Sequence, residues 1–216
     1  PVPSPRVPGL LVGAVPDPAE REALAAELGL GPGRGRPLLL SVSRIAPQKR
    51  LDLVVASAER MRHDAEVVWA VAGAGAPDDL ARWQERAAGT CVRFLGARAD
   101  VPALLRAASA LVLTSDWEAR ALVVQEAMAA GVLVVATEVG GIPGLMAGTG
   151  RLVPAGSAGA LAAALDLLVD DLRRDPGAVA RQGLEGRRVA ASWPDGAATA
   201  HQWVTWYSGP PGDDLD

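Results

Sequence analysis

The sequence predicts an α/β fold with a Rossmann-like, doubly wound parallel sheet, and three observations support this prediction. Short apolar runs without polar alternation recur along the chain, which is typical of strands buried on both faces. Helical segments of roughly 10 to 15 residues separate these runs. Half of the 216 residues are hydrophobic, which is enough for one sizeable core. We therefore expect a parallel sheet covered by helices on both faces, with right-handed crossovers.

Each element follows from the local sequence. Strands are expected at 38–42, 67–71, 91–95, 110–113 and 133–136, with a short sixth candidate at 152–154. Helices are expected at 17–28, 50–61, 78–88, 101–108, 122–130, 157–169, 176–191 and 196–207. Asp17 suits the N-cap of the first helix, Pro18 suits its first turn, and Asp100 suits the cap of a later one. Trp203 and Trp206 on the last helix are interpreted as packing residues.

The distribution of proline and glycine suggests how the chain is organised. Residues 1–36 carry scattered prolines and a glycine-rich stretch, so we interpret them as an N-terminal linker segment. Residues 37–208 form the predicted Rossmann-like domain, and residues 209–216 a flexible tail. Because the first residue is Pro1 rather than Met, we expect the sequence to be a piece of a longer protein.

Composition argues against several classes of function. The net charge of −4 leaves no basic field for a nucleic acid. Cys91 is alone, and His63 and His201 lie far apart without a second ligand at metal spacing, so we expect no disulfide within the chain and no bound metal. No apolar run approaches the roughly 18 residues of a membrane span. No secretion signal is visible, and we expect a cytoplasmic location.

Two glutamates are the most informative polar residues. Glu118 comes just past the strand at 110–113, and Glu126 lies early in the next helix. Both should therefore lie at the carboxyl edge of the sheet, where open α/β folds bind ligands. Carboxylates accept hydrogen bonds from sugar or ribose hydroxyls, and a helix N-terminus holds phosphate. This pattern indicates sugar-nucleotide chemistry, the alternative being a solvated loop acid and a helix acid at the favourable end of the dipole.

Two cations follow the first strand. Arg44 and Lys49 could neutralise a diphosphate and stabilise it as a leaving group. The alternative is that both are ordinary surface charges.

Main-chain groups supply further candidates. Gly140 and Gly141 follow the fifth strand and could let a ligand approach the backbone, or form an ordinary turn. Leu95 and Ala97 could border a base pocket, or simply end a strand.

Several motifs together resemble the C-terminal, donor-binding domain of the retaining group 1 (family 4) glycosyltransferases over about residues 37–207. They are SVSRIAPQKRLD, VRFLGARADVPALLRAASALVLTSDWE, the E-x7-E from Glu118 to Glu126, EAMAAGVLVVATEVGGIP and GTGRLVPAG. The resemblance implies the C-terminal half of a GT-B fold and metal-independent catalysis with retention. It also implies that Arg44 and Lys49 bind the donor diphosphate, that Glu118 contacts the hexose and that Glu126 contacts the ribose.

One stretch departs from the family pattern. Ala119, Arg120 and Ala121 replace a Gly-Phe-Gly-like triplet, and with Leu122 they are the predicted donor-binding loop. Without two glycines the backbone can approach the sugar phosphate less freely, whereas Arg120 could add a phosphate contact.

The resulting hypothesis is the donor half of an enzyme that transfers a hexosyl group from a nucleotide sugar to an unknown acceptor. We expect no cofactor, inactivity without an N-terminal acceptor-binding domain, and membrane association only through that domain. The alternatives are a non-catalytic nucleotide-binding or partner-docking module and a sugar-nucleotide epimerase relative.

Overall fold

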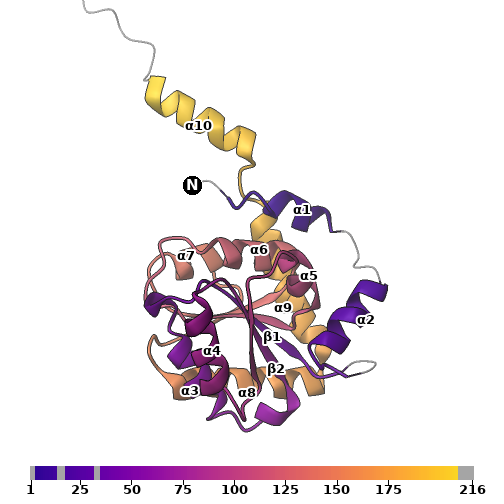
Figure 1. Ribbon diagram of the computed structural model, residues 1–216. Helices are drawn as coiled ribbons and strands as arrows, with labels where there is room; N and C mark the ends of the chain where they lie inside the picture. The colour runs from indigo at the N-terminus through magenta and orange to yellow at the C-terminus, as the bar shows by residue number, and fades with distance from the viewer. Residues whose placement is uncertain (1–2, 14–17, 32–34, 209–216) are drawn as a thin grey trace, which may run out of the picture.

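Six parallel strands form one sheet in the order β3-β2-β1-β4-β5-β6 (Figure 1). The computed structural model describes residues 3–13, 18–31 and 35–208. The strands are β1 (Leu38–Val42), β2 (Val68–Ala72), β3 (Val92–Gly96), β4 (Ala110–Leu113), β5 (Leu133–Thr137) and β6 (Arg151–Val153). The strand order reverses between β1 and β4, which pair in parallel through Leu39 and Leu40. The predicted Rossmann-like sheet is therefore confirmed, including its short sixth strand.

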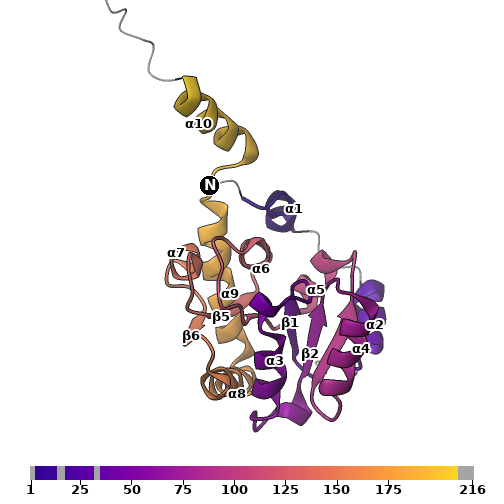
Figure 2. The ribbon, with the colours of Figure 1, turned by 60° about the vertical axis from the view of Figure 1, so that its left-hand side comes forward.

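Helices cover both faces of this sheet (Figures 1 and 2). They are α1 (Val7–Val12), α2 (Pro18–Glu27), α3 (Leu51–Ala58), α4 (Pro77–Arg86), α5 (Val101–Ala107), α6 (Leu122–Ala130), α7 (Ile142–Met146), α8 (Ala158–Arg174), α9 (Pro176–Ala191) and α10 (Gly196–Ser208). Two single turns of 3₁₀ helix, η1 (Pro47–Lys49) and η2 (Asp64–Glu66), complete the set.

Alternate side chains of each strand enter two different cores, as the pleat requires. In β1, Leu38 and Leu40 pack with α1, α5 and α6, whereas Leu39 packs with α3 and α8. All three leucines are almost completely buried. Apolar side chains on both faces of a strand explain why the runs show no polar alternation.

The N-terminal segment packs on the domain where the structure describes it. Val7 and Leu10 of α1 are buried in the core that α6 and α9 also line. Leu24 and Leu28, from α2 and the turn after it, join the same core. The boundary predicted at residue 36 stays a prediction. The tail at 209–216 and the predicted cap Asp17 lie outside the described residues.

One local expectation was confirmed in position only, and another was wrong. Asp100 stands at the N-cap of α5 without a capping side-chain hydrogen bond, because its carboxylate instead accepts from Arg98 at 2.8 Å and 2.7 Å. Trp203 and Trp206 are 44% and 85% exposed rather than packed, since α10 projects away from the body of the domain (Figures 1 and 2).

In the described part of the chain, no helix is both long and apolar enough to cross a membrane.

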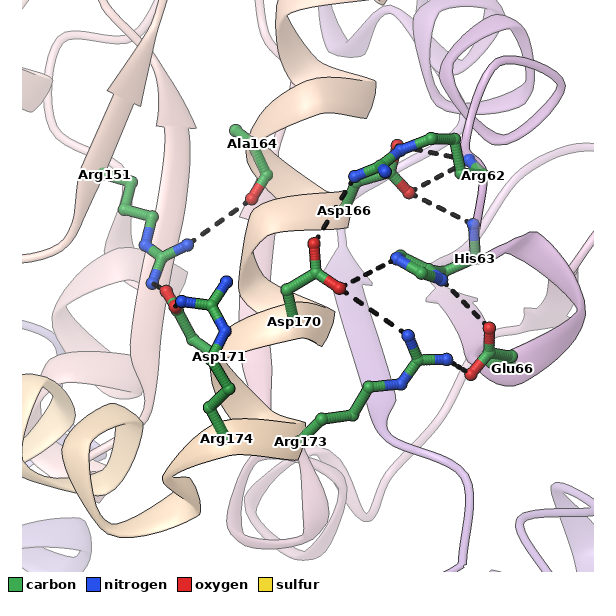
Figure 3. Close-up of polar contacts among 10 residues, drawn as sticks. All are labelled: Arg62, His63, Glu66, Arg151, Ala164, Asp166, Asp170, Asp171, Arg173 and Arg174. Atoms are coloured by element: carbon green, nitrogen blue, oxygen red, sulfur yellow. Dashed lines mark hydrogen bonds and ion pairs between the residues drawn. The ribbon is translucent and has the colours of Figure 1, made fainter.

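A polar network fastens α8 beside the amino end of β2 (Figure 3). The buried Asp166 carboxylate accepts from the main-chain N–H groups of Arg62 at 3.0 Å and His63 at 3.1 Å. The His63 ring lies between Glu66 at 2.9 Å and Asp170 at 3.1 Å. This network lies at the opposite edge of the sheet from the predicted site, so His63 has a structural role.

Candidate functional site

Three loops meet at the carboxyl ends of β1, β4 and β5, beside the point where the strand order reverses. Open α/β sheets bind their ligands at such a point. A small pocket opens there between the end of β1 and the end of β4. Its lining consists of Ser41, Val42, Ser43, Lys49, Leu51, Val112, Leu113, Thr114 and Ser115.

Lys49 and Glu118 form an ion pair at this edge. The Lys49 Nζ contacts Glu118 Oε1, although the two residues are 69 positions apart in sequence. Their side chains are only 17% and 10% exposed, so the pair is poorly screened by solvent. Ser115 Oγ donates to the same oxygen at 2.7 Å. None of the residues that the structure describes donates to Glu118 Oε2, which leaves that oxygen available to a ligand hydroxyl.

Hydrogen bonds to main-chain carbonyls hold the β1 loop against the β4 loop. Thr114 Oγ1 donates to the Lys49 carbonyl at 2.7 Å, and the Asp116 N–H donates to the Gln48 carbonyl at 3.0 Å. The Gln48 side-chain amide donates to the Trp117 carbonyl at 2.5 Å. Lys49 and Glu118 therefore sit on two loops that are held together before any ligand arrives.

Arg50 reinforces this junction. It adopts a left-handed conformation at φ 50° and binds Asp52 at 2.9 Å and Asp116 at 2.7 Å. These hydrogen bonds raise the pKa of Arg50, and Arg50 in turn lowers the pKa of the Asp52 carboxyl. The guanidinium thus stays charged and bridges the start of α3 to the β4 loop.

Gly140 and Gly141 let the β5 loop pack directly against the backbone of Glu118 and Ala119. The Gly141 N–H donates to the Glu118 carbonyl at 3.0 Å. A Cβ atom on Gly140 would overlap the Glu118 carbonyl oxygen, and one on Gly141 would overlap that of Ala119. Gly140 also has a φ of +50°. Close loop packing therefore requires both glycines, whereas their predicted contact with the donor stays a prediction.

Glu126 lies beneath the N-terminal segment. Its side chain is 6% exposed, and its Oε1 accepts from Ser4 Oγ at 2.6 Å. Arg6 Nη1 lies 3.4 Å from Oε2. The neighbouring Gln125 Oε1 accepts from the Ser4 N–H at 2.9 Å. The structure therefore does not bring Glu126 into contact with Lys49 and Glu118, but gives it a separate partner 122 residues away.

The remaining predicted residues surround these groups. Arg44 is exposed, and no other described residue forms a hydrogen bond or ion pair with it. The Arg120 guanidinium lies 5.8 Å from the Trp193 ring centre, and its buried Nε has no hydrogen-bond partner among the described residues. Ala121 is buried at the N-cap of α6, next to the half-exposed Leu122.

Leu95 and Ala97 lie at the carboxyl end of β3, at the same edge of the sheet but on an outer strand. Leu95 is partly buried, whereas Ala97 is exposed, as is Ala119 in the β4 loop. Among the predicted residues, the structure thus joins Lys49, Glu118, Ala119, Gly140 and Gly141 directly.

Ser4, Thr114, Ser115 and Gln125 contribute to the site although they were not predicted from the sequence. Thr114 and Ser115 follow β4 directly, so their position beside Glu118 was a usable signal. Gln125 offered a weaker signal, as an uncharged polar residue inside a largely apolar helix. Ser4 offered none, because its contacts span more than a hundred residues.

Comparison with known proteins identifies the family of this chain. A family model described as glycosyl transferases group 1 matches residues 36–171. The chain belongs to this family. The resemblance to the group 1 glycosyltransferases is thereby confirmed.

Two relatives show how the length of this chain compares with that of other proteins. It is 35% identical to alpha-maltose-1-phosphate synthase of Mycobacterium tuberculosis over 188 residues, which cover 79% of this chain and 47% of that protein. It is 33% identical to D-inositol 3-phosphate glycosyltransferase of Nocardia farcinica over 207 residues, which cover 88% of this chain and 44% of that protein. The group 1 chain thus spans about half the length of the curated relatives it matches.

Solved structures agree on the fold. A glycosyltransferase from Rickettsia africae superimposes with a TM-score of 0.80 at 19% identity, covering 93% of this chain and 54% of that one. Sucrose-phosphate synthase from Thermosynechococcus elongatus gives a TM-score of 0.70 at 28% identity, covering 88% and 48%. The predicted Rossmann-like half of a GT-B fold is confirmed by this agreement and by the parallel sheet.

Proposed function

We propose that this chain is the donor-binding domain of a retaining glycosyltransferase that transfers a hexosyl group from a nucleoside diphosphate sugar to an acceptor. The observation that carries the proposal is the Lys49–Glu118 pair at the switch point of the sheet. A cation suits the donor phosphates there, and a carboxylate with one free oxygen suits a sugar hydroxyl. Membership of the group 1 family supports the same reaction class.

The diphosphate is the leaving group in this proposal, and the chain offers several groups to stabilise its charge. Lys49 supplies a cation at the pocket, and the exposed Arg44 on the same loop supplies a second. The first N–H groups of α6, which begins at Leu122, lack partners within the helix and face the carboxyl edge of the sheet. The Gly140 N–H likewise has no partner among the described residues. Preorganised donors of this kind stabilise developing negative charge.

In this proposal the two glutamates bind the two sugar rings of the donor. Glu118, held by Lys49 and Ser115, orients a hexose hydroxyl, whereas Glu126 on α6 accepts from the ribose. The donor loop at 119–122 lies between them, with Leu95 and Ala97 bordering the base. No metal or cofactor enters the proposed reaction, because cations and N–H groups neutralise the diphosphate.

The acceptor and the second half of the active site belong to the rest of the parent protein in this proposal. A separate N-terminal domain binds the acceptor, so this chain alone binds donor without transferring sugar. A cytoplasmic location, with any membrane contact made through the acceptor domain, is part of the same proposal.

Ligand-dependent stabilisation tests donor binding. Thermal unfolding is measured with millimolar UDP-glucose, GDP-mannose and ADP-glucose; UDP-glucose comes first because Anabaena HepE, of similar fold, was solved in complex with it. At least one donor should raise the Tm, and Lys49→Ala should make that rise much smaller. Arg188→Ala is the control, because Arg188 is 75% exposed on α9. If no nucleotide changes the Tm, or if Lys49→Ala responds like the parent chain, the proposal is wrong.

A non-catalytic nucleotide-binding or docking module is the second candidate. The Arg120 guanidinium favours it, since it lies 5.8 Å from the Trp193 ring centre where the family pattern has a glycine-containing triplet. This candidate predicts nucleotide binding without turnover by the full-length protein. Detection of sugar transfer or donor hydrolysis by the full-length protein would exclude it.

A further inference from the structure

The segment at residues 3–6 closes over the first turns of α6 through Ser4. Ser4 is 1% exposed and makes two hydrogen bonds to consecutive α6 residues. Its N–H donates to Gln125 Oε1 at 2.9 Å, and its hydroxyl donates to Glu126 Oε1 at 2.6 Å. The next helix, α1, anchors the segment because Val7 and Leu10 are buried against α6 and α9. Ser4 is therefore an integral part of the α6 surface.

Ser4 is the main orienting partner of the Glu126 carboxylate. A carboxylate that is only 6% exposed has lost most of its water, so it needs hydrogen-bond partners within the protein. Arg6 lies at 3.4 Å, but its side chain is 52% exposed, so solvent weakens that contact. The Ser4 bond is short and wholly buried. It fixes where Oε1 points and leaves further lone pairs on the carboxylate for other hydroxyl donors.

Gln125 adds a second, independent observation. Its side chain is fully buried, yet its Nε2 has no hydrogen-bond partner in the described part of the chain. Its Oε1 is already used by Ser4. Buried donors are rarely left unsatisfied, and such a group commonly marks a place where an absent ligand or water completes the bonding. The polar cluster of Ser4, Gln125 and Glu126 thus retains both a free donor and free acceptor capacity.

We propose that Ser4 is a positioning residue of the donor site, which orients the Glu126 carboxylate to accept the vicinal hydroxyls of the donor ribose. The inference rests on the function proposed above and extends it to the segment before the predicted domain. Ser4 thereby sets a preference for ribonucleotides over 2′-deoxyribonucleotides. Lys49, at the phosphate end, contributes to affinity without contributing to this preference.

The test compares dissociation constants for a ribonucleoside diphosphate and its 2′-deoxy form, measured by calorimetry. The nucleotide is whichever of UDP, GDP and ADP stabilises the parent chain most. The parent chain should bind the ribo form about tenfold more tightly, as expected for one hydrogen bond to a charged group. Ser4→Ala should bring the ratio close to one, because the ribo form loses more affinity than the deoxy form, which keeps only its 3′-hydroxyl as a donor to Glu126. Ser4→Thr, which restores the hydroxyl, should restore the ratio.

Two control variants distinguish a specific loss of Glu126 orientation from a general loss of nucleotide binding. Lys49→Ala should weaken both nucleotides and keep their ratio, and Ser192→Ala, on the exposed end of α9, should change neither. If Ser4→Ala does not fold, Ser4→Cys replaces it, since a thiol keeps the shape but donates weakly. A folded variant without the hydroxyl that keeps the parental ratio overturns the inference. Equal binding of both forms by the parent chain also overturns it and leaves the proposed function standing, whereas failure of every nucleotide to bind overturns both.

Discussion

Lys49 and Glu118 meet because they lie on loops that follow two neighbouring strands at the same edge of the sheet. Lys49 ends η1, and Glu118 follows β4, which pairs with β1. Parallel strands place all their carboxyl ends together, so distant parts of the sequence converge there. The loop hydrogen bonds then hold the pair in place.

A substitution of Gly140 tests whether this loop packing contributes to stability. Gly140→Ala should lower the free energy of unfolding by roughly 1–3 kcal/mol, because the new Cβ overlaps the Glu118 carbonyl and the backbone is left-handed. Urea unfolding followed by circular dichroism measures the change. Gly144→Ala is the matched control, since a Cβ there meets nothing within 4 Å and φ is ordinary. Equal stability of the two variants would contradict the proposed packing role.

Cys91 offers another test at the residue scale. The thiol is buried, and burial, aided by the neighbouring Asp64, raises its pKa. Because only the thiolate attacks disulfides, the native chain should react with Ellman's reagent at pH 8 far more slowly than a free thiol does. In unfolding concentrations of urea the same residue should react fully. Rapid reaction of the native chain would show that this part of the core opens readily.

At the scale of elements, α8 is fastened by Asp166 rather than by packing alone. Its carboxylate satisfies the N–H groups of Arg62 and His63 at the end of the α3 region (Figure 3). Both donors would lose their partner if the side chain were removed. The cost of such unsatisfied groups exceeds that of losing an exposed ion pair.

Asp166→Ala should therefore destabilise the chain by about 1–3 kcal/mol. Arg173→Ala in the same network should change stability by less than about 0.5 kcal/mol, because that side chain is 45% exposed. Chemical denaturation of both variants at pH 7 makes the comparison. A larger loss in Arg173→Ala than in Asp166→Ala would assign the fastening to the surface ion pairs instead.

At the scale of the whole molecule, two arginines link separate elements through one carboxylate each, and their pairs with nearby aspartates give stability a defined pH dependence. Arg98 binds Asp100 and also contacts Glu27 of α2, and Arg50 joins α3 to the β4 loop. Hydrogen bonds from Arg98 and Arg50 lower the pKa values of Asp100 and Asp52. A carboxyl with a lowered folded-state pKa stabilises the fold above its unfolded pKa, near 3.9, and loses that contribution as the pH falls through the folded value.

The free energy of unfolding should accordingly be steady between about pH 5 and 7 and fall below about pH 4. Urea titrations at pH 7, 5 and 3 measure this loss. Arg98→Ala should make the loss smaller, because Asp100 then titrates alike in the folded and unfolded chains. An unchanged acid loss in that variant would mean that other carboxyls dominate it.

The sequence by itself determined the fold class, the strands to within a residue or two, and the edge at which Lys49 and Glu118 meet. Those features depend on local apolar patterning and on the geometry that every parallel sheet shares. Only the tertiary structure decided that Ser4 binds Glu126, that Arg120 lies over the Trp193 ring and that Gly140 packs against Glu118. Such contacts join residues that are far apart in the chain, and they depend on how loops dock after the sheet has formed. No periodicity along the chain encodes that docking.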